Sequence, residues 1–332
     1  MKLIIPMAGR GTRVRPHSHT IPKPLLPVAG TMIVERIVET FSRTLDRNID
    51  EIVYILGPDF GREIREKLSG MSKRHNAKAT FKIQEVALGT AHAVSCADEK
   101  LEGEAIIVFA DTIFDTSETV SVEGADSVIW LKEVDDPSRF GVAVLKDDKI
   151  TDFVEKPSEP ISNLAIIGVY YFKKAEELNE EIQYLIDNEI KGHGGEYQLT
   201  DALDRLLKKG KIFKKATVDE WLDCGTLSAW LETTSEILQK ENHTFGKYEN
   251  TTIHPPVFIG ENVAIKDSEI GPYTSIESGT EILSSTLKNT IVQENAILNR
   301  CNLSNSTIGN HAELTNVTGE LHVGDHSIVH QK

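Results

Sequence analysis

The chain has few cysteines and no arrangement of them that suggests a cross-linked or metal-bound scaffold. Its three cysteines, Cys96, Cys224 and Cys301, are widely spaced and form no CxxC pair. An odd number at such spacing excludes a disulfide framework and a thiolate zinc site of the usual pattern. Free thiols fit a reducing compartment, so we expect a cytoplasmic protein.

Long apolar runs and an excess of positive charge are also missing. No stretch of about 18 apolar residues occurs, so no transmembrane helix is expected, and the first residues lack the apolar region of a signal peptide. Lys and Arg number 36 against 51 Asp and Glu, a formal net charge of −15. This balance argues against nucleic-acid and anionic-membrane partners. Small phosphate ligands stay open, because a few local cations and backbone N–H groups can bind one.

The length of 332 residues predicts two domains rather than one. Up to about residue 242, short apolar runs alternate with amphipathic stretches, which is typical of βαβ units on a mainly parallel sheet. We expect strands over residues 3–5, 51–56, 80–84, 105–109, 127–134, 142–145 and 169–172. We expect helices over residues 32–45, 60–71, 90–97, 174–188, 198–209 and 227–240.

After Asn242 the helical pattern stops, and Asn, Ser, Thr and Gly dominate. Apolar residues recur at steps of about six, with small slips in phase. They are Ile259, Ile265, Ile270, Ile276, Ile282, Ile291, Ile297, Leu303, Ile308 and Leu314. This period predicts a parallel β-helix, which we expect to be left-handed. The expected layout is an α/β domain over 1–242, a linker over 243–252 and the β-helix over 253–332.

A glycine-rich turn follows the first expected strand. It reads Pro6-Met7-Ala8-Gly9-Arg10-Gly11-Thr12-Arg13, and its backbone N–H groups can surround phosphate oxygens. The turn is not a P-loop, and Val14 stands where a dinucleotide fingerprint needs a third small residue. Arg13 adds a planar fork of donors suited to phosphate.

A lysine between two prolines comes next. Lys23 is flanked by Pro22 and Pro24, which restrict the backbone on both sides. A rigidly presented cation of this kind suits charge stabilisation at a transferring phosphorus. A plain surface turn is the alternative for this segment taken alone.

These two segments, Ala8–Pro16 and Pro22–Gly30, resemble the signature of sugar-1-phosphate nucleotidyltransferases. Members of that family join a nucleoside triphosphate to a sugar 1-phosphate and release pyrophosphate. The resemblance covers about residues 1–240 and implies a Rossmann-like, GT-A-like mixed sheet, and a C-terminal β-helix is common in the family. Further segments fall in the family's order: residues 84–93, 110–111, 140–142, 154–157, 163, 168, 196–201 and 221–226. The run Pro16–Thr20 departs from the family's usual Pro-Leu-Thr, and we expect its His17 and His19 to be loop residues.

The resemblance implies a role for each matching residue. Asp111 and Asp223 would bind Mg²⁺, and Arg13, Lys23 and Asp111 would be catalytic. The implied nucleotide-binding residues are Ala8, Gly9, Gly11, Thr12, Arg13, Gln84 and Gly89. The implied sugar-phosphate-binding residues are Gly141, Glu155, Lys156, Asn163, Gly168 and Glu196.

The residues themselves leave simpler roles open. Asp111 and Asp223 each follow an apolar strand-like run, where open α/β sheets place ligands, but either could be a turn or cap residue. Glu155 and Lys156 could be a solvated pair before a proline, and Glu196 could be an acid placed favourably at a helix N-terminus. Cys224 is expected to be a packed small residue.

The leading interpretation is a homo-oligomeric enzyme, associating through its β-helix, that uses dTTP or UTP and glucose 1-phosphate. One alternative is a β-helix acyltransferase, for which His311, His322, His326 and His330 are available. The other alternative is a non-catalytic subunit that binds a nucleotide sugar for regulation. Retention of Arg13 and the other charged residues of the signature argues against the second alternative.

Overall fold

The computed structural model describes residues 1–9, 11–45, 47–117, 119, 122–146, 149–159 and 161–331. Arg10 of the glycine-rich turn lies outside these residues. Contacts divide the chain into two compact units that interleave along the sequence. The first unit comprises Met1–Gly9, Ile37–Ala110 and Phe114–Trp221. The second unit comprises Arg10–Arg36, Asp111–Ile113 and Leu222–Lys332. The layout expected from the sequence, with boundaries at 242 and 252, stays a prediction.

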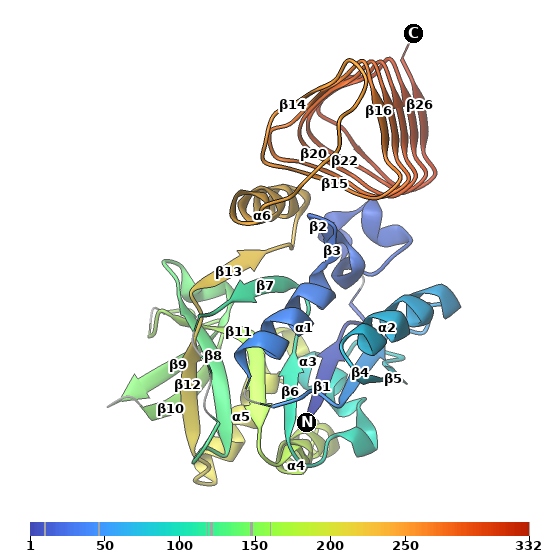
Figure 1. Ribbon diagram of the computed structural model, residues 1–332. Helices are drawn as coiled ribbons and strands as arrows, with labels where there is room; N and C mark the ends of the chain where they lie inside the picture. Colours follow the sequence, from blue (N-terminus) through green and yellow to red (C-terminus); the bar gives the residue numbers. More distant parts are fainter. Residues whose placement is uncertain are drawn as a thin grey trace. The chain divides into compact units, whose positions relative to one another are not determined.

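The first unit is built on a mixed sheet, whose central strands are seen side by side in Figure 1. Its order is β10 (Lys149–Glu155), β9 (Gly141–Lys146), β11 (Leu164–Phe172), β6 (Ala105–Val108), β1 (Lys2–Pro6), β4 (Glu51–Leu56) and β5 (Lys78–Ile83). Beside β11 lie β8 (Ser127–Glu133) and then β12 (Phe213–Thr217). Strands β6, β1, β4 and β5 are parallel, whereas β11 is antiparallel to β6 and β8. The predicted Rossmann-like mixed sheet is therefore confirmed.

Both faces of the central strands are buried, which explains their nearly continuous apolar runs. Successive side chains of a strand point to opposite faces. On one face, Ile4 and Val53 join a core with residues of α3 (Thr90–Ser95), α4 (Ala175–Asp187) and α5 (Leu199–Lys208). On the other face, Tyr54 contacts Ser72 of α2 (Arg62–Arg74) with 2.8 Å between their hydroxyl oxygens.

The predicted strands and helices of the first unit are all present, with ends shifted by at most five residues. The sequence pattern did not predict β7 (Thr112–Asp115), β10 or β12, and it gave only an apolar run before Asp223 where β13 (Glu220–Asp223) lies. Each of these strands has at most two adjacent apolar residues, so no longer apolar run marks it.

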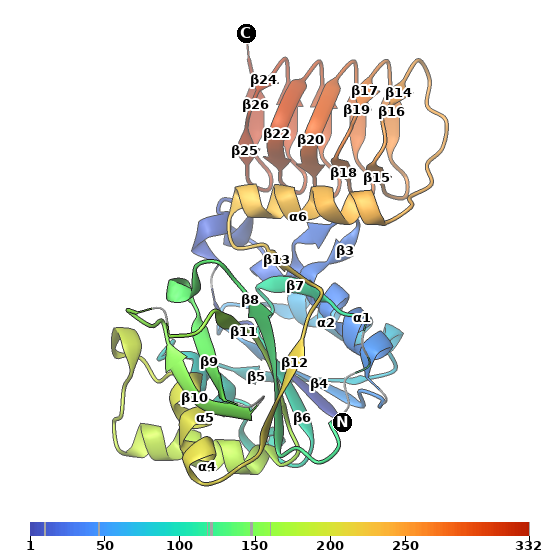
Figure 2. The same ribbon diagram turned by 90° about the vertical axis from the view of Figure 1, so that its left-hand side faces the viewer.

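The second unit combines a short N-terminal segment with a long C-terminal one. It contains the hairpin of β2 (Pro27–Val28) and β3 (Thr31–Met32), then α6 (Leu227–Lys240) and a stack of parallel strands. Figure 2 shows α6 running along the stacked coils. Trp230 of α6 is fully buried, and its indole N–H donates to the Pro27 carbonyl oxygen at 2.7 Å.

The C-terminal strands are short, and every pair among them is parallel. One sheet has the order β16 (Ala264–Lys266), β19 (Glu281–Leu283), β21 (Ile297–Asn299), β23 (Glu313–Thr315) and β26 (Ile328–His330). A second sheet is formed by β14 (Thr252–Ile253), β15 (Val257–Ile259), β17 (Glu269–Ile270), β18 (Thr274–Ile276), β20 (Thr286–Val292), β22 (Asn302–Ile308), β24 (Thr318–Gly319) and β25 (His322–Val323). Ala264 pairs with Glu281, Glu281 with Ile297 and Glu313 with Ile328, which are offsets of 17, 16 and 15 residues. Three sides of five or six residues each give coils of this length, as in the predicted β-helix.

The strict six-residue phase was wrong at one position. Ile297 is 42% exposed, whereas its neighbour Leu298 is fully buried. The reason is register, because Leu298 pairs with the buried Ile282 of the preceding coil. A coil shorter than three full hexads moves the inward position by one residue.

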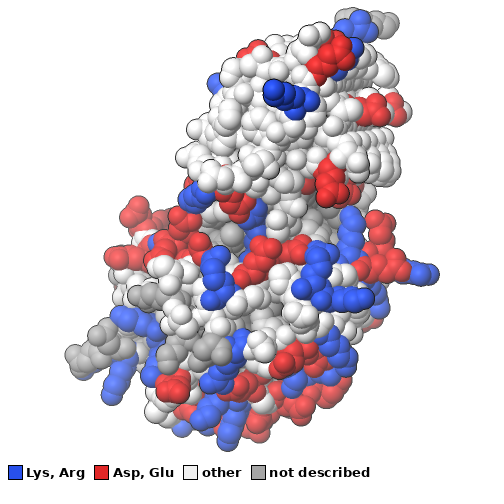
Figure 3. Space-filling view, in the orientation of Figure 1, with Lys and Arg blue, Asp and Glu red and all other residues white. Residues whose placement is uncertain are grey.

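No helix among the described residues is long and apolar enough to cross a membrane. On the face drawn in Figure 3, Lys and Arg side chains are interspersed with Asp and Glu. The visible coils of the β-helix carry few charges of either sign.

Candidate active site

The glycine-rich turn brings Gly11 against Lys23 within the second unit. Gly11 has φ 54°, in the left-handed region, and it precedes a short 3₁₀ turn over Thr12–Val14. A Cβ on Gly11 would lie 2.9 Å from the Cβ of Lys23, so glycine is needed for both conformation and close approach. Arg13 lies within that 3₁₀ turn.

Ala8 and Gly9 belong to the first unit and continue directly from β1. A Cβ on Gly9 would meet no described atom within 4 Å. The protein itself therefore does not require glycine there. A small residue at this position leaves room beside the backbone N–H groups, as expected for a turn that receives phosphate oxygens.

Lys23 is buried, and its ammonium group donates to the backbone oxygen of Asp111 at 2.6 Å. Asp111 follows the last residue of β6 by three positions. Neighbouring residues displace water from the Asp111 carboxyl, and this loss of hydration raises its pKa. Asp223 adds to that rise, while Lys23 and Arg13 oppose it. The four charged residues predicted as the phosphate and metal group therefore act on one another within one unit.

Asp223 is held by the turn that follows β13. Its Oδ1 accepts the backbone N–H of Gly225 at 2.7 Å. A Cβ on Gly225 would lie 2.7 Å from Asp223 Oδ1 and 3.2 Å from an Arg13 guanidinium nitrogen. Gly225 is thus a residue that the sequence analysis did not single out, although it belongs to the quoted segment 221–226. Cys224 beside it is buried with a pKa raised to about 12, which confirms a packing role rather than a nucleophile.

The donor set of this group suits a hard divalent cation. Asp111 and Asp223 offer carboxylate oxygens, which Mg²⁺ prefers, and one or two carboxylates plus phosphate oxygens and water are its usual ligands. A cation there would also relieve the repulsion that raises the pKa of Asp111. The residues present therefore fit Mg²⁺.

The implied base-binding residues lie in the first unit. Gln84 is buried, and its amide nitrogen lies 3.1 Å from His92 Nδ1 on α3. Gly89 has φ 119°, and a Cβ there would lie 2.4 Å from the Tyr197 carbonyl oxygen. Close approach of two backbones accounts for this glycine. The same close approach places the segment after Gln84 against the segment that carries Glu196.

Part of the implied sugar group also comes together in the first unit. Glu155 Oε2 accepts from the Thr200 hydroxyl at 3.1 Å, and a Cβ on Gly141 would lie 2.9 Å from the same oxygen. Lys156 Nζ lies 3.8 Å from Glu155 Oε1. Glu196 precedes α5, with its Oε2 3.4 Å from the Gln198 amide. Thr200 was not singled out from the sequence, although it belongs to the quoted segment 196–201.

Asn163 and Gly168 have other neighbours. The Asn163 amide nitrogen donates to Glu133 Oε1 at 2.6 Å. Gly168 interrupts the pairing of β11 with β8, and its carbonyl accepts the Phe109 N–H at 3.0 Å. The sugar-binding roles of both residues stay predictions.

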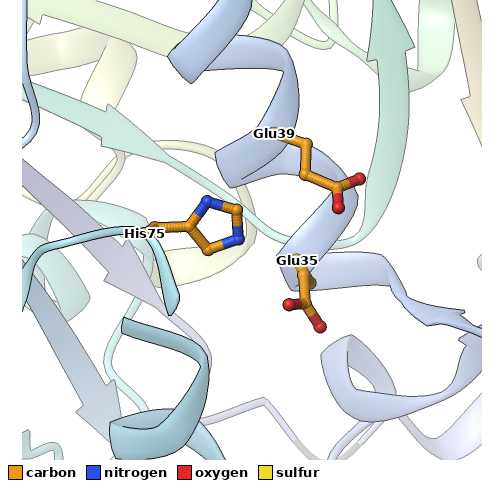
Figure 4. A group of neighbouring side chains, drawn as sticks. All are labelled: Glu35, Glu39 and His75. Carbon is orange, nitrogen blue, oxygen red and sulfur yellow. The ribbon is translucent and has the colours of Figure 1, made fainter. Parts of the chain in front are cut away.

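Two other groups bring histidine or acidic side chains together. His311 and His326 of the β-helix stack with ring centroids 5.0 Å apart, and the Nδ1 of His322 pairs with the Thr307 hydroxyl. Figure 4 shows two glutamates on successive turns of α1 (Ile33–Thr44) and His75 just past α2. Exposed acidic groups of this kind are common without a bound ion, so the group in Figure 4 does not by itself define a metal site.

Comparisons with known proteins agree with the fold. A family model described as nucleotidyl transferase matches residues 2–240. The bifunctional protein GlmU of Methanococcus maripaludis is 35% identical over 80% of this chain and 62% of its own length. The chain thus spans less than two thirds of that relative.

A second relative matches from end to end, and a solved structure matches the fold. Glucose-1-phosphate thymidylyltransferase of Streptomyces antibioticus is 28% identical over 99% of both chains. The crystal structure of a UDP-glucose pyrophosphorylase with UDP-glucose superposes with a TM-score of 0.58 at 23% identity, covering 72% of this chain and 99% of that one. That likeness shows the fold alone. Because the family model covers well over half of the sequence, the chain belongs to the nucleotidyl transferase family.

Proposed function

We propose that the protein transfers a nucleoside monophosphate from a nucleoside triphosphate to a sugar 1-phosphate, releasing pyrophosphate. The observation that carries this is the grouping of Arg13, Lys23, Asp111 and Asp223 within one unit of a nucleotidyl transferase. The relative named glucose-1-phosphate thymidylyltransferase supports dTTP as nucleotide and glucose 1-phosphate as sugar, and UTP is the other nucleotide that the sequence resemblance favours. Within the described part of the chain, no comparable group of charged residues supports the alternatives of an acyltransferase or a regulatory subunit.

The chemistry is a single displacement at phosphorus. An oxygen of the sugar phosphate forms a bond to the α-phosphorus while the bond from that phosphorus to the bridging oxygen breaks, and pyrophosphate leaves with the electron pair. Both reactants are anions, so catalysis rests on holding them together and neutralising charge. When bound by Asp111 and Asp223, Mg²⁺ would neutralise phosphate oxygens. Lys23 and Arg13 supply fixed positive charge for the same oxygens.

The remaining roles follow from the other residues. Ala8, Gly9, Gly11 and Thr12 would offer backbone N–H groups to the triphosphate. Gln84 would present its amide to a pyrimidine edge, with His92 holding it. Glu155 would accept hydrogen bonds from sugar hydroxyls, and Lys156 would contact the sugar phosphate. The free thiols of Cys96, Cys224 and Cys301 fit a reducing compartment.

A pyrophosphate-release assay tests the proposal directly. The intact chain would be given each of the common nucleoside triphosphates with a panel of sugar 1-phosphates and Mg²⁺. We expect release that depends on both substrates, and mass spectrometry should detect the corresponding nucleotide sugar. Absence of release with every pair would refute the proposal.

We also propose a homo-oligomer that associates through the β-helix. Leu283, Ile297 and Ile328 are 42%, 42% and 65% exposed, and they lie on strands of one β-helix sheet. Light scattering on the intact chain should give a mass above that of one copy. Ile297→Asp should shift that mass toward the monomer, and a monomeric wild type would contradict the proposal.

A further inference from the structure

His17 is buried inside the second unit, contrary to the loop residue expected from the sequence. Its side chain is 0% exposed. The imidazole ring meets the edge of Trp230 on α6, with ring centroids 5.2 Å apart at 71°. Two side chains of the β-helix, Gln293 and Thr307, bind its two nitrogens at 2.7 and 2.8 Å. Both ring nitrogens of the buried His17 are therefore hydrogen-bonded by side chains of the protein.

The direction of each hydrogen bond in this group is determined by its neighbours. The Asn310 amide nitrogen can only donate, and it faces Gln293 Oε1 at 3.3 Å. Gln293 therefore turns its amide nitrogen to His17 Nδ1, which must accept. His17 Nε2 then carries the proton and donates to the Thr307 hydroxyl oxygen. The Thr307 hydroxyl in turn donates to His322 Nδ1 at 2.9 Å. The chain of donors is complete only for neutral His17.

A second attachment lies three residues further on. The Thr20 hydroxyl donates to Asp325 Oδ2 at 2.6 Å. Asp325 Oδ1 accepts the backbone N–H of Asn310 at 2.8 Å, so the carboxylate is held by the coil that also orients Gln293. A Cβ on Gly324 would lie 3.0 Å from Pro16 Cβ, which shows close packing at the start of the run. The run 16–20 thus contacts the β-helix at Pro16, His17 and Thr20.

The same run is joined to the phosphate-binding residues. The Ser18 hydroxyl donates to the Gly11 carbonyl oxygen at 2.7 Å. Gly11 in turn packs so closely against Lys23 that a Cβ on Gly11 would lie 2.9 Å from the Cβ of Lys23. The run 16–20, which His17 anchors, is therefore hydrogen-bonded to Gly11, and Gly11 contacts Lys23. In this way His17 is connected to the segment that carries Arg13 and Lys23.

From this geometry we propose that Gln293 and Thr307 of the β-helix, acting through His17, are positioning residues for the phosphate-binding segment 11–25. The inference rests on the proposed function for its catalytic consequence. The physical basis is that a complete buried hydrogen-bond network holds its residues in one conformation. Removing one member leaves a buried polar group unpaired, which destabilises that conformation. The β-helix would then contribute to nucleotide binding without touching the nucleotide.

Three threonine variants of the intact chain test the proposal. Thr307→Val removes the hydroxyl without changing the shape of the side chain, and Thr307→Ser retains the hydroxyl. Thr290→Val is the matched control, because Thr290 is equally buried and donates to the backbone oxygen of Lys288 at 2.9 Å. Gln293→Met removes the donor on the other side of the His17 ring and serves as an independent second variant. Each variant's thermal unfolding would be measured first, and kinetics would be run well below its midpoint.

We expect Thr307→Val and Gln293→Met to speed hydrogen–deuterium exchange of residues 11–25 in the nucleotide-free protein. We expect both to lower kcat/KM for the nucleoside triphosphate about tenfold, with KM for the sugar 1-phosphate nearly unchanged. Thr307→Ser and Thr290→Val should resemble the wild type in both measurements.

Equal exchange of segment 11–25 in Thr307→Val and Thr290→Val would overturn the inference, as would equal kinetics. A wild type that releases no pyrophosphate with any substrate pair would refute the proposed function instead. In that case the exchange measurement still decides whether the β-helix positions this segment.

Discussion

Replacing Glu277 by glutamine should stabilise the protein at alkaline pH and have little effect at acidic pH. Glu277 is 7% exposed on the β-helix. Its Oε1 accepts from the Gly30 N–H at 3.3 Å and from the Ser275 hydroxyl at 3.0 Å. Burial raises the pKa of the Glu277 carboxyl to about 7 from its ordinary 4.5. The hydrogen bonds from Ser275 and Gly30 oppose this rise, Glu294 adds to it, and Arg36 opposes it.

The sign follows from proton binding. Below pH 4.5 the carboxyl is protonated in both folded and unfolded chains, so its ionisation does not change the free energy of unfolding. Between pH 4.5 and 7 the unfolded chain loses this proton while the folded chain keeps it, so stability falls as pH rises. The whole difference in pKa corresponds to about 3 kcal/mol at pH 8. Glutamine keeps the accepting oxygen and removes the charge, so it should recover most of that amount.

Denaturant unfolding of wild type and Glu277→Gln at pH 5 and pH 8 measures the effect. We expect a gain of about 2–3 kcal/mol at pH 8 and less than about 1 kcal/mol at pH 5. Glu281→Gln is the control, because Glu281 is exposed on β19 and should show no such dependence on pH. An equal effect of Glu277→Gln at both pH values would refute the reasoning.

Three further predictions concern the charged group and its support. Asp111→Asn and Lys23→Ala should each lower kcat about a hundredfold or more, measured as pyrophosphate release, while circular dichroism stays that of the wild type. Gly225→Ala should lower activity, because its Cβ would meet Asp223 Oδ1 at 2.7 Å, whereas Gly61→Ala, where a Cβ meets nothing within 4 Å, should not. Burial lowers the pKa of His17 to about 4, with Asp325 opposing and His322 adding to the effect, so the wild type should lose about 2 kcal/mol between pH 7 and pH 5. His17→Asn should lack that slope in the same unfolding experiment, and an unchanged slope would contradict the assignment of His17 as the buried neutral group.

Local signals in the sequence were enough to predict the α/β sheet and the phosphate-binding candidates. A glycine turn after an apolar run, and a lysine between prolines, have few structural solutions. Apolar runs likewise marked Asp111 and Asp223 as candidates, although β13, which ends at Asp223, pairs with β7 in a separate two-stranded sheet and not in the main sheet. The structure adds that all four charged candidates belong to the same unit. Their roles in binding and catalysis are still predictions.

Long-range partners could not be predicted in the same way. His17 and its partners Gln293 and Thr307 are 276 and 290 residues apart in the chain. Gln and Thr are ordinary residues on the outside of a β-helix coil, so nothing in their spacing marks them as buried partners of a distant histidine. Ile297 illustrates the same limit on a smaller scale. Its outward direction depends on pairing with the coil before it rather than on its own hexad.

The interleaving of the two units gives the β-helix a role that a separate C-terminal domain would not have. The family model ends at residue 240, yet residues 10–36 group by contact with the coils that follow it. Phe258 occupies the space where a Cβ of Gly30 would lie, at 2.2 Å, and Glu277 binds the N–H of the same glycine. His17, thirteen residues before Gly30, makes a second such contact with the coils. Because these contacts bury polar groups that only the coils satisfy, removing the coils would leave the phosphate-binding segment with unpaired donors and acceptors. In this chain the β-helix is therefore part of the framework that holds Arg13 and Lys23.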